Sequence, residues 1–358
     1  MNKLLLALLL FLLSFSWIKV TASDSCPAAF PWKAQWINTE RCQSATNTWL
    51  IYRKSFAVTD VPNQLIARIA ADSKYWLWIN DQLVIFEGGL KRGPSPSGTY
   101  YDPVDIAPYL TKGSNTIAIL LWHFGKDGFS HINSGKAALL FEAIAPGLEI
   151  VSDASWQCAL YEAYQNTEAP FPNYRMPESN IRFDARQAIT NWNRTSFEGS
   201  LPGAVCVGKA GKAPFGDLVE RPIPQWKNSG LLSYVSVRES LKGDTLFCRL
   251  PYNAQITPYL KVEAEAGKTI HIRMDNYEGG SERNVRAEYI TREGEQEYES
   301  YGWMNGHEVY YIIPEGVKVL DVKYRETGYN TDLAGSFHCD DPFYDELWQR
   351  SARTLYIT

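Results

Sequence analysis

The sequence predicts a mainly β protein, built from tandem antiparallel β-sandwich domains of jelly-roll-like form and followed by one helix. Two observations support this prediction. Short apolar or alternating segments, separated by turn residues, recur between residues 48 and 324, which is typical of antiparallel sandwiches. A helical spacing of apolar residues is strong only after Asp341, where it indicates a single amphipathic helix.

The chain has 358 residues, a length that suggests two or three domains. We divide it into a signal peptide over 1–22, an N-terminal β-sandwich over 23–147, a loop-rich β segment or insertion over 148–232, a second β-sandwich over 233–335, and the start of a helical domain over 336–358.

The first 22 residues have the layout of a secretory signal peptide. Lys3 provides a positive start, Leu4–Phe15 an apolar core, and Val20–Ala22 a cleavage site of small residues. The apolar run is about a dozen residues, which is too short for a membrane span. We therefore expect an exported protein, periplasmic or extracellular after cleavage, with no membrane span in the mature chain.

Charge and cysteine content limit the partners. The net charge of −5 argues against nucleic acid, because phosphate binding needs a basic surface. The six cysteines permit disulfides in an oxidising compartment, with Cys26 and Cys42 as the first candidate pair and buried free thiols as the alternative. No cysteine spacing matches a zinc site, and no nucleotide-binding or nucleophile-turn motif is present. We expect neither metal nor cofactor.

Strands of the first sandwich are expected where apolar runs end at turn residues. A hairpin around Asn80-Asp81 is the most specific of these signals. The predicted strands are Thr48–Val58, Leu65–Ala71, Lys74–Ile79, Gln82–Phe86, Thr116–Phe124 and Lys136–Ala145.

The second sandwich shows the same pattern, with Pro251, Gly267 and Pro314 as interruptions. Its predicted strands are Tyr234–Glu239, Thr245–Leu250, Tyr259–Ala264, Thr269–Met274, Val309–Ile313 and Val317–Tyr324.

The predicted helix begins at Pro342, with Asp340 or Asp341 as its N-cap. Its apolar stripe consists of Phe343, Leu347, Trp348, Ala352, Leu355 and Tyr356. Because an amphipathic helix needs another element to cover such a stripe, we expect this chain to be the front part of a longer protein.

Trp76 and Trp78 are the first candidates for carbohydrate binding. Alternation along the strand places both indoles on one face, opposite Tyr75, Leu77 and Ile79. Flat indoles on an open sheet face can stack on a sugar ring. The alternative is that both faces are buried, one by the core and one by a neighbouring domain.

Trp303, Asn305 and His307 form a second candidate, because all three side chains can contact a sugar. They are expected at the rim of a pocket or, alternatively, at a simple hairpin tip. His123, Asp127 and His131 could suggest a metal, but histidines so placed are more often held by hydrogen bonds.

Carboxylates are dense between Asp275 and Glu299, and glycoside hydrolysis needs a pair of them. Glu288 is the residue we would test first in this run. A solvated hairpin face explains the same pattern, and we assign no catalytic residue within the chain.

Several motifs resemble the N-terminal β-domain region of bacterial α-L-rhamnosidases, and the similarity covers nearly all of the mature chain. The more specific ones lie after residue 285. The motifs are Tyr52–Phe56, Ala71–Tyr75, Leu110–Asn115, Arg286–Arg292, Trp303–His307 and Tyr324–Tyr329.

The resemblance implies inverting glycoside hydrolases whose β-domains precede an (α/α)6 barrel that carries the catalytic acid and base. The helix from Pro342 would then be the first helix of that barrel, which is otherwise missing here. It further implies a rhamnose-containing oligosaccharide or glycoside as partner, and no activity for this chain alone. The alternative function is a stand-alone exported carbohydrate-binding or interaction protein built of β-sandwiches.

Overall fold

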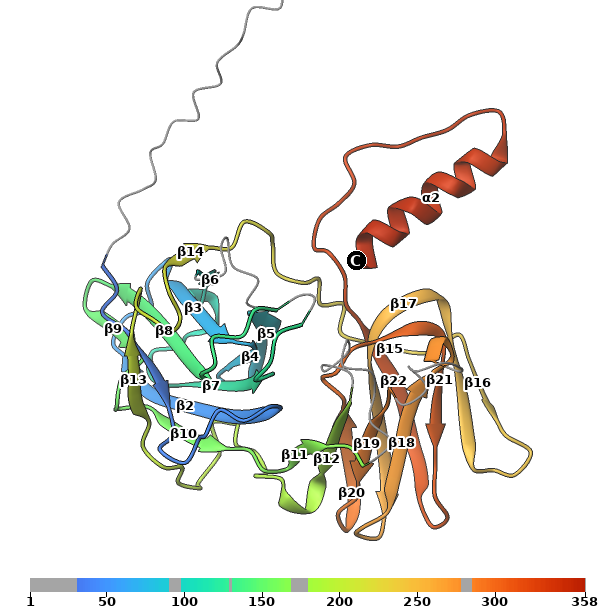
Figure 1. Cartoon of the computed structure of the whole chain (residues 1–358), viewed down its shortest axis with the longest axis horizontal. Coiled ribbons are helices and arrows are strands. Elements are labelled where there is room, and N and C mark those ends of the chain that lie inside the picture. Colours follow the sequence, from blue (N-terminus) through green and yellow to red (C-terminus); the bar gives the residue numbers. More distant parts are fainter. Residues whose placement is uncertain (1–30, 90–97, 129–130, 169–179, 278–284, 358) are drawn as a thin grey trace, which may run out of the picture. The chain divides into compact units, whose positions relative to one another are not determined.

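A computed structural model shows the mainly β architecture that the sequence predicts (Figure 1). It describes residues 31–89, 98–128, 131–168, 180–277 and 285–357. The expected signal peptide over 1–22 and Cys26 lie outside these residues. The five described cysteines, Cys42, Cys158, Cys206, Cys248 and Cys339, are unpaired.

The first sandwich contains a five-stranded antiparallel sheet. Its strands, in spatial order, are β10 (Gln157–Leu160), β2 (Thr48–Val58), β7 (Gly113–His123), β4 (Lys74–Ile79) and β5 (Gln82–Gly89). The expected hairpin is confirmed, since β4 and β5 pair across Asn80-Asp81. Both turn residues have positive φ, which Asn and Asp tolerate better than most residues.

A seven-stranded sheet packs against the first one. Its order is β13 (Val205–Lys209), β1 (Gln35–Asn38), β8 (Ala138–Ala145), β3 (Ile66–Asp72), β6 (Thr99–Asp105) and β14 (Leu218–Glu220), with β9 (Leu148–Val151) also paired to β8. Tyr52, Leu77 and Ile119 from one sheet and Ile69 and Phe141 from the other share a fully buried core. Burial of these apolar surfaces is the main favourable term in holding the layers together.

The strands of the second sandwich are all connected by hydrogen bonds into one ten-stranded sheet. Its order is β11 (Tyr164–Asn166), β12 (Ile181–Asp184), β19 (Ala287–Ile290), β18 (Thr269–Met274), β21 (Met304–Ile312), β17 (Thr245–Ala264), β22 (Lys318–Glu326) and β15 (Leu231–Leu232), with β16 (Ser236–Glu239) and β20 (Gly294–Glu299) also paired to β17. Side chains from β17, β18, β21 and β22 meet in a single core.

The long strand β17 connects two groups of strands in this sheet, because its two parts have different partners. Its first part pairs with β21, and its second part pairs with β22 and β20. The sequence predicted two strands here, separated at Pro251, and that separation is wrong. Pro251 lies instead in a register shift between Arg249 and Ala254, which is where a strand can accommodate a residue without an N–H.

Residues 148–232 supply strands to both sandwiches. From this segment β9, β10, β13 and β14 join the sheets of the first sandwich, whereas β11, β12 and β15 join the second. Short 3-10 turns, η1 (Ala107–Tyr109), η3 (Ala185–Gln187) and η4 (Asp275–Tyr277), complete the described elements.

The helix α2 (Pro342–Ile357) begins where the sequence places it. The backbone N–H of Phe343 donates to Asp341 Oδ1 at 3.0 Å, which confirms Asp341 as the N-terminal cap. No residue of α2 is buried, and Phe343 and Leu355 are 62% and 68% exposed. No helix in the described ranges is both long enough and apolar enough to cross a membrane.

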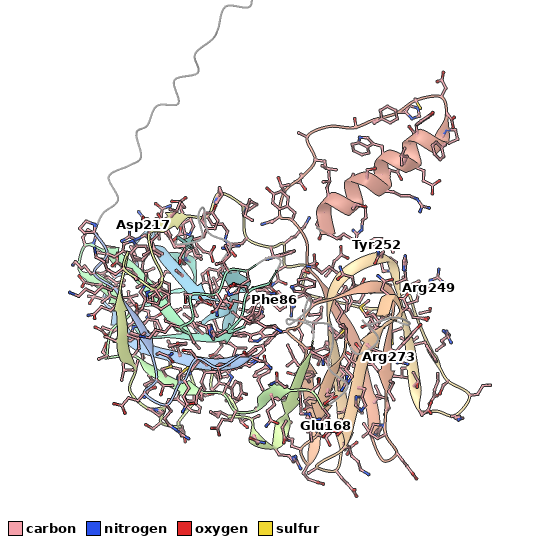
Figure 2. All side chains as sticks on the ribbon, in the orientation of Figure 1. Phe86, Glu168, Asp217, Arg249, Tyr252 and Arg273 are labelled. Carbon is pink, nitrogen blue, oxygen red and sulfur yellow. The ribbon has the colours of Figure 1, made fainter. Side chains whose placement is uncertain are left out.

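The last turns of α2 contact the end of the second sandwich. Arg353 pairs with Glu326 at 2.9 Å, and its guanidinium lies over the ring of Tyr252. Tyr252 is labelled in Figure 2. The Tyr329 N–H donates to the Tyr356 carbonyl at 2.8 Å. These contacts hold one end of the helix and half-bury Tyr356, whereas Phe343, Leu347 and Leu355 of the stripe remain exposed.

Candidate functional site

The outer face of the five-stranded sheet carries a layer of tryptophans. Trp49 stacks on Trp122 and on Trp76, with ring centroids 4.5 and 5.9 Å apart. The side chain of Asn47 accepts hydrogen bonds from the indole N–H groups of Trp49 and Trp122. This arrangement follows from the alternation of β2, β4 and β7, which places successive side chains on opposite faces.

Trp76 offers no open face to a ligand. It is fully buried, and Tyr301 stacks on it at a centroid distance of 4.7 Å. The hypothesis that its indole stands on an open sheet face is therefore wrong, and burial by a neighbouring domain describes it correctly. Trp78 is 8% exposed and packs edge-on against Trp192.

The structure does not place Trp303, Asn305 and His307 together on a loop at the rim of a pocket. Asn305 and His307 belong to β21, where Asn305 lies opposite Gln255. The backbone N–H of His307 donates to Asp275 Oδ1 at 2.8 Å, while its side chain is exposed. Trp303 is half-buried beside Lys74, whose ammonium lies 5.2 Å from its ring centroid.

A buried ion pair lies at the edge of the same sheet. Lys74 Nζ is 2.8 Å from Glu87 Oε1, and both side chains are at most 2% exposed. The rings of Trp122, Phe124 and Trp303 surround the ammonium at 5.2–5.9 Å. Cation–π attraction and the carboxylate together compensate for the loss of hydration.

Glu288 is held as a structural anion. Its carboxylate accepts hydrogen bonds from Arg182 at 2.7 and 2.8 Å and from Arg286 at 2.7 Å. Burial alone would raise the pKa of Glu288, but the two guanidinium groups outweigh it and lower that pKa. A group held in this way is poorly suited to donate or accept a proton, so the hypothesis of hydrolysis at Glu288 has no support.

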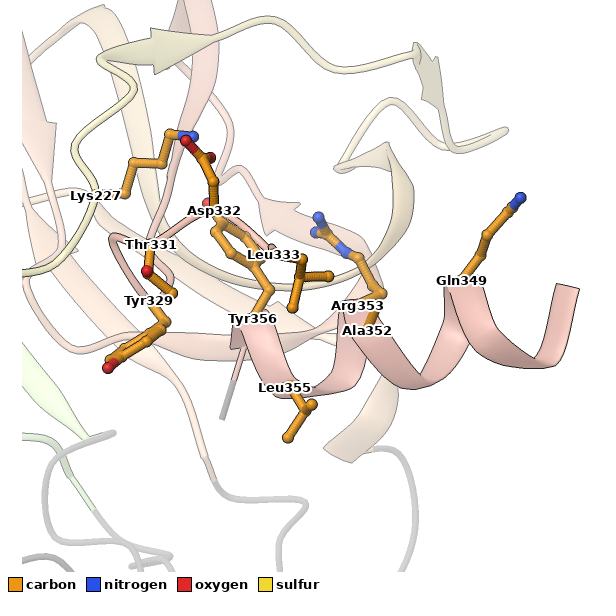
Figure 3. A pocket seen from close by; sticks show the side chains of 10 residues that line it. All are labelled: Lys227, Tyr329, Thr331, Asp332, Leu333, Gln349, Ala352, Arg353, Leu355 and Tyr356. Carbon is orange, nitrogen blue, oxygen red and sulfur yellow. The ribbon is translucent and has the colours of Figure 1, made fainter. Parts of the chain in front are cut away.

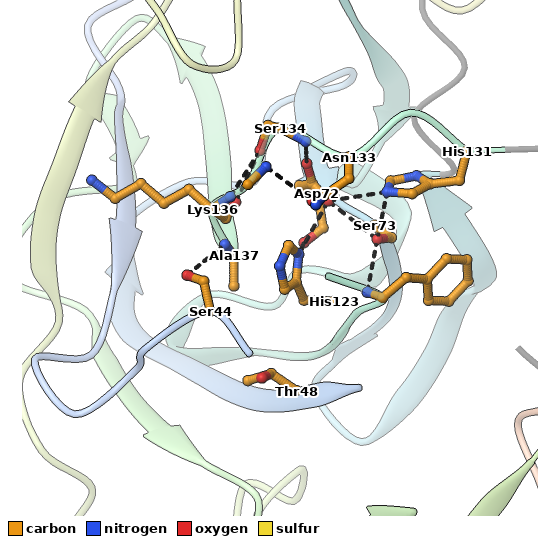
Figure 4. Close-up of polar contacts among 12 residues, drawn as sticks. Ser44, Thr48, Asp72, Ser73, His123, His131, Asn133, Ser134, Lys136 and Ala137 are labelled. Carbon is orange, nitrogen blue, oxygen red and sulfur yellow. Dashed lines mark hydrogen bonds and ion pairs between the residues drawn. The ribbon is translucent and has the colours of Figure 1, made fainter. Parts of the chain in front are cut away.

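The two histidines of the first sandwich share a carboxylate that the sequence analysis missed (Figure 4). His123 Nδ1 lies 3.1 Å from Asp72 Oδ1, and His131 Nε2 lies 3.1 Å from Ser73 Oγ and 3.4 Å from Asp72 Oδ1. Burial would raise the pKa of Asp72, yet the imidazoles lower it well below its usual range. Asp127 lies outside this cluster and caps the backbone N–H of Asn133 at 2.7 Å.

This cluster fixes a loop to the sheet. The backbone N–H of Ser134 donates to Asp72 Oδ2 at 2.9 Å, and that of Phe124 donates to Ser73 Oγ at 3.0 Å. Each histidine is thus held by hydrogen bonds of one ring nitrogen, Nδ1 of His123 and Nε2 of His131, the alternative that the sequence analysis weighed against a metal. Among the described residues no group of three or more His, Cys, Asp or Glu side chains could hold a metal ion.

Trp78 lines a pocket of about 160 Å³ that we call the seam pocket. Strands β4 and β7 of the first sandwich and β20 of the second contribute to its wall, together with the 161–164 and 192–193 segments. The residues that line it are Trp78, Leu120, Tyr161, Tyr164, Phe183, Trp192, Asn193, Glu297, Tyr298, Glu299 and Tyr301.

A second hollow, of about 350 Å³, lies between α2 and the chain that follows β22 (Figure 3). Leu355, Tyr356 and Leu333 give it apolar walls, and Lys227 and Asp332 give it charged ones. The mixture of groups does not indicate a particular ligand.

No protein-family model matches the sequence, and no curated protein matches it. Solved structures do match. The GH78 family rhamnosidase of Bacillus sp. GL1 aligns with a TM-score of 0.77 at 17% identity, over 91% of this chain and 58% of that chain. The α-L-rhamnosidase of Dictyoglomus thermophilum aligns with a TM-score of 0.64 at 20% identity, over 88% and 38%.

This chain has the fold of the β-domains of α-L-rhamnosidases. The Streptomyces avermitilis α-L-rhamnosidase, solved with L-rhamnose, also aligns, with a TM-score of 0.62 at 16% identity, over 85% of this chain and 31% of that one. The resemblance inferred from the sequence motifs is thus confirmed at the level of the fold. The chain spans less than two thirds of each of these rhamnosidases.

Within this rhamnosidase-type fold, the sequence analysis missed most of the seam pocket. Trp192 and Asn193 lie in a segment with no regular pattern, and Glu297 and Glu299 were counted only as part of an acidic run. The Trp-x-Trp pattern of β4 singled out both Trp76 and Trp78, and of these two only Trp78 lines the pocket.

Proposed function

We propose that this chain is the non-catalytic β-domain region of an α-L-rhamnosidase-like glycoside hydrolase that acts on rhamnose-containing glycans. The observation that carries the proposal is the extent of the fold match. The match covers 91% of this chain but 58% of the Bacillus rhamnosidase, so that enzyme has a large part with no counterpart here.

The carboxylates of the chain support a non-catalytic role. Hydrolysis of a glycosidic bond needs two carboxyl groups free to act as acid and base on opposite sides of the bond. The buried carboxylates of Asp102 and Glu288 and the partly buried one of Glu299 instead face arginines at 2.6–2.9 Å. Such pairs stabilise the ionised form and fix its position.

The exposed stripe of α2 supports a helical partner. Phe343, Leu347 and Leu355 are 48–68% exposed on a helix that buries none of its residues. A patch of this kind on one face of a helix usually marks an interface. In this proposal α2 is the first helix of the catalytic domain, and the following helices cover its stripe.

The test of activity is turnover of an aryl α-L-rhamnoside and release of rhamnose from a rhamnose-containing polysaccharide by the purified chain. We expect no product, with an active α-L-rhamnosidase as the positive control. Release of rhamnose that scales with the concentration of this chain would contradict the proposal.

The test of origin is the gene itself. We expect the reading frame beyond codon 358 to encode further amphipathic helices. A stop codon there, in a protein that binds glycans, would favour the alternative of a stand-alone carbohydrate-binding protein.

We also propose that the chain is exported, from the layout of its first 22 residues. N-terminal sequencing of the protein from its native host is expected to begin after Ala22. An intact Met1 start in the cytoplasmic fraction would contradict export.

A further inference from the structure

We propose that the seam pocket is a binding site for one neutral sugar ring. Its volume of about 160 Å³ lies below the range of about 300–1,000 Å³ that is usual for drug-sized ligands. The pocket therefore admits a small ligand only.

The apolar part of the wall suits the C–H face of a sugar. Trp78 and Trp192 meet edge to face at 5.5 Å, and Tyr161 packs edge-on against Trp192 at 6.1 Å. Each of these rings is 6–8% exposed, and all three line the pocket. Aromatic rings held this firmly bind without losing further side-chain freedom.

The polar part of the wall suits hydroxyl groups. Glu297 Oε2 accepts from the Tyr259 hydroxyl at 2.8 Å, while its other oxygen has no partner among the described residues. The Asn193 amide makes no hydrogen bond to any residue in the described ranges. One carboxylate oxygen and one amide thus offer both acceptors and donors to a ligand.

The charge of the pocket selects against acidic sugars. Glu299 is paired with Arg325 at 2.8 and 2.9 Å, and it also accepts from the Thr257 hydroxyl at 2.7 Å. Its negative charge is thus balanced, whereas Glu297 shares one lysine with Glu295: Lys261 lies opposite Glu297 in the β17–β20 pairing and forms its ion pair with Glu295 at 2.6 Å. One ammonium therefore faces two carboxylates, and this side of the pocket keeps a net negative charge. An anionic ligand would be repelled by Glu297, so a neutral sugar is the class that fits.

The position of Asn193 is set by a tight turn. Asn191 has a φ of +58°, and the Arg194 N–H donates to the Asn191 carbonyl at 2.8 Å. The Arg53 guanidinium, which donates to the Trp192 and Arg194 carbonyls, holds the same turn to β2. The backbone that carries Asn193 is therefore held at the pocket by contacts that do not involve a ligand, and its side-chain amide is left to pair with one.

The experiment is titration of the full chain by protein-observed NMR or calorimetry. The probes are L-rhamnose, methyl α-L-rhamnopyranoside, D-galactose, D-glucose and D-glucuronate. We expect saturable binding of at least one neutral sugar in the millimolar range and none of glucuronate. Rhamnose is first in the panel because of the proposed function, but the pocket proposal does not depend on it.

Two variants test the location. Asn193→Ala and Glu297→Gln are each expected to weaken binding about three- to tenfold, the effect of one lost hydrogen bond. Glu263→Gln is the control, because Glu263 is exposed on β17, pairs with Lys318 at 3.3 Å and lies outside the pocket. Melting temperatures within a few degrees of the parent chain would show that all three variants are folded.

Each outcome decides one point. No saturable binding of any sugar, or binding that is unchanged in both pocket variants, would overturn the site. Binding of galactose or glucose without rhamnose would uphold the site and count against rhamnose-containing glycans as the substrate class. Loss of binding in Glu263→Gln as well would place the sugar outside the seam pocket and overturn the proposed location.

Discussion

Tyr301 stacks on Trp76, with ring centroids 4.7 Å apart and planes inclined by 26°. Trp76 belongs to β4 of the first sandwich, and Tyr301 precedes β21 of the second. Phe86 meets both rings edge-on, at 6.5 Å from Trp76 and 5.9 Å from Tyr301. This group of three rings joins the two sandwiches through apolar contact.

Replacing Tyr301 by alanine is therefore expected to destabilise the chain. Tyr301 is partly buried, so loss of its ring is expected to cost up to about 3 kcal/mol, including the stacking contribution. Tyr301→Phe keeps the ring and is expected to cost less than about 1 kcal/mol. Denaturant unfolding of both variants measures the difference, and equal stabilities would show that the stack contributes little.

The buried pair of Lys74 and Glu87 gives a second prediction. Glu87→Gln leaves an ammonium without its counter-charge among three aromatic rings, which costs about 3–5 kcal/mol. The double variant Lys74→Met/Glu87→Gln also removes the unpaired ammonium and is expected to recover part of that loss of stability. A double variant less stable than Glu87→Gln would mean that the pair does not act as a unit.

Some of these features follow from the sequence. The strand Thr48–Val58 was predicted with the ends that β2 has, because an apolar run between turn residues fixes both of them. The start of α2 was predicted because Asp341 and Pro342 form an N-terminal signal that depends on local residues alone. In both cases the determining interactions lie within a few residues of one another.

Other features depend on distant residues and could not be predicted in this way. Alternation places Trp76 and Trp78 on the outer face of β4, but it does not say what covers that face. The covering residues, Tyr161, Trp192 and Tyr301, lie more than eighty positions further along the chain. Asp72 was missed for the same reason, because its partners His123 and His131 come from another strand and a loop.

Glu288 gives a prediction for the dependence of stability on pH. Its pKa in the folded protein is lowered by Arg182 and Arg286, below the value of about 4.3 that is usual in an unfolded chain. The stabilisation is therefore present above that unfolded value and is lost as the pH falls through the lowered folded value. We expect Glu288→Gln to be less stable by about 3 kcal/mol at pH 7, with a smaller difference near pH 3.

The control for this experiment is Glu315→Gln, at an exposed turn after β21. Its stability should follow that of the parent chain at every pH, since surface substitutions change stability by at most about 0.5 kcal/mol. Unfolding curves in denaturant between pH 3 and pH 8 provide the measurement. A difference between Glu288→Gln and the parent that stays constant with pH would argue against linkage through this carboxylate.

The exposed stripe of α2 leads to the last prediction. Deleting residues 343–358 is expected to raise the solubility of this chain, because the deletion removes exposed Phe343, Leu347 and Leu355. It also removes Arg353, which pairs with Glu326, so a small loss of stability at the end of β22 should accompany the gain.

Replacing the three apolar residues by serine keeps Arg353 and separates the two effects, because solubility should rise without that loss of stability. Light scattering as a function of protein concentration measures solubility, and thermal unfolding measures stability. Increased aggregation in both variants would mean that α2 stabilises the second sandwich and does not present an interface to another domain.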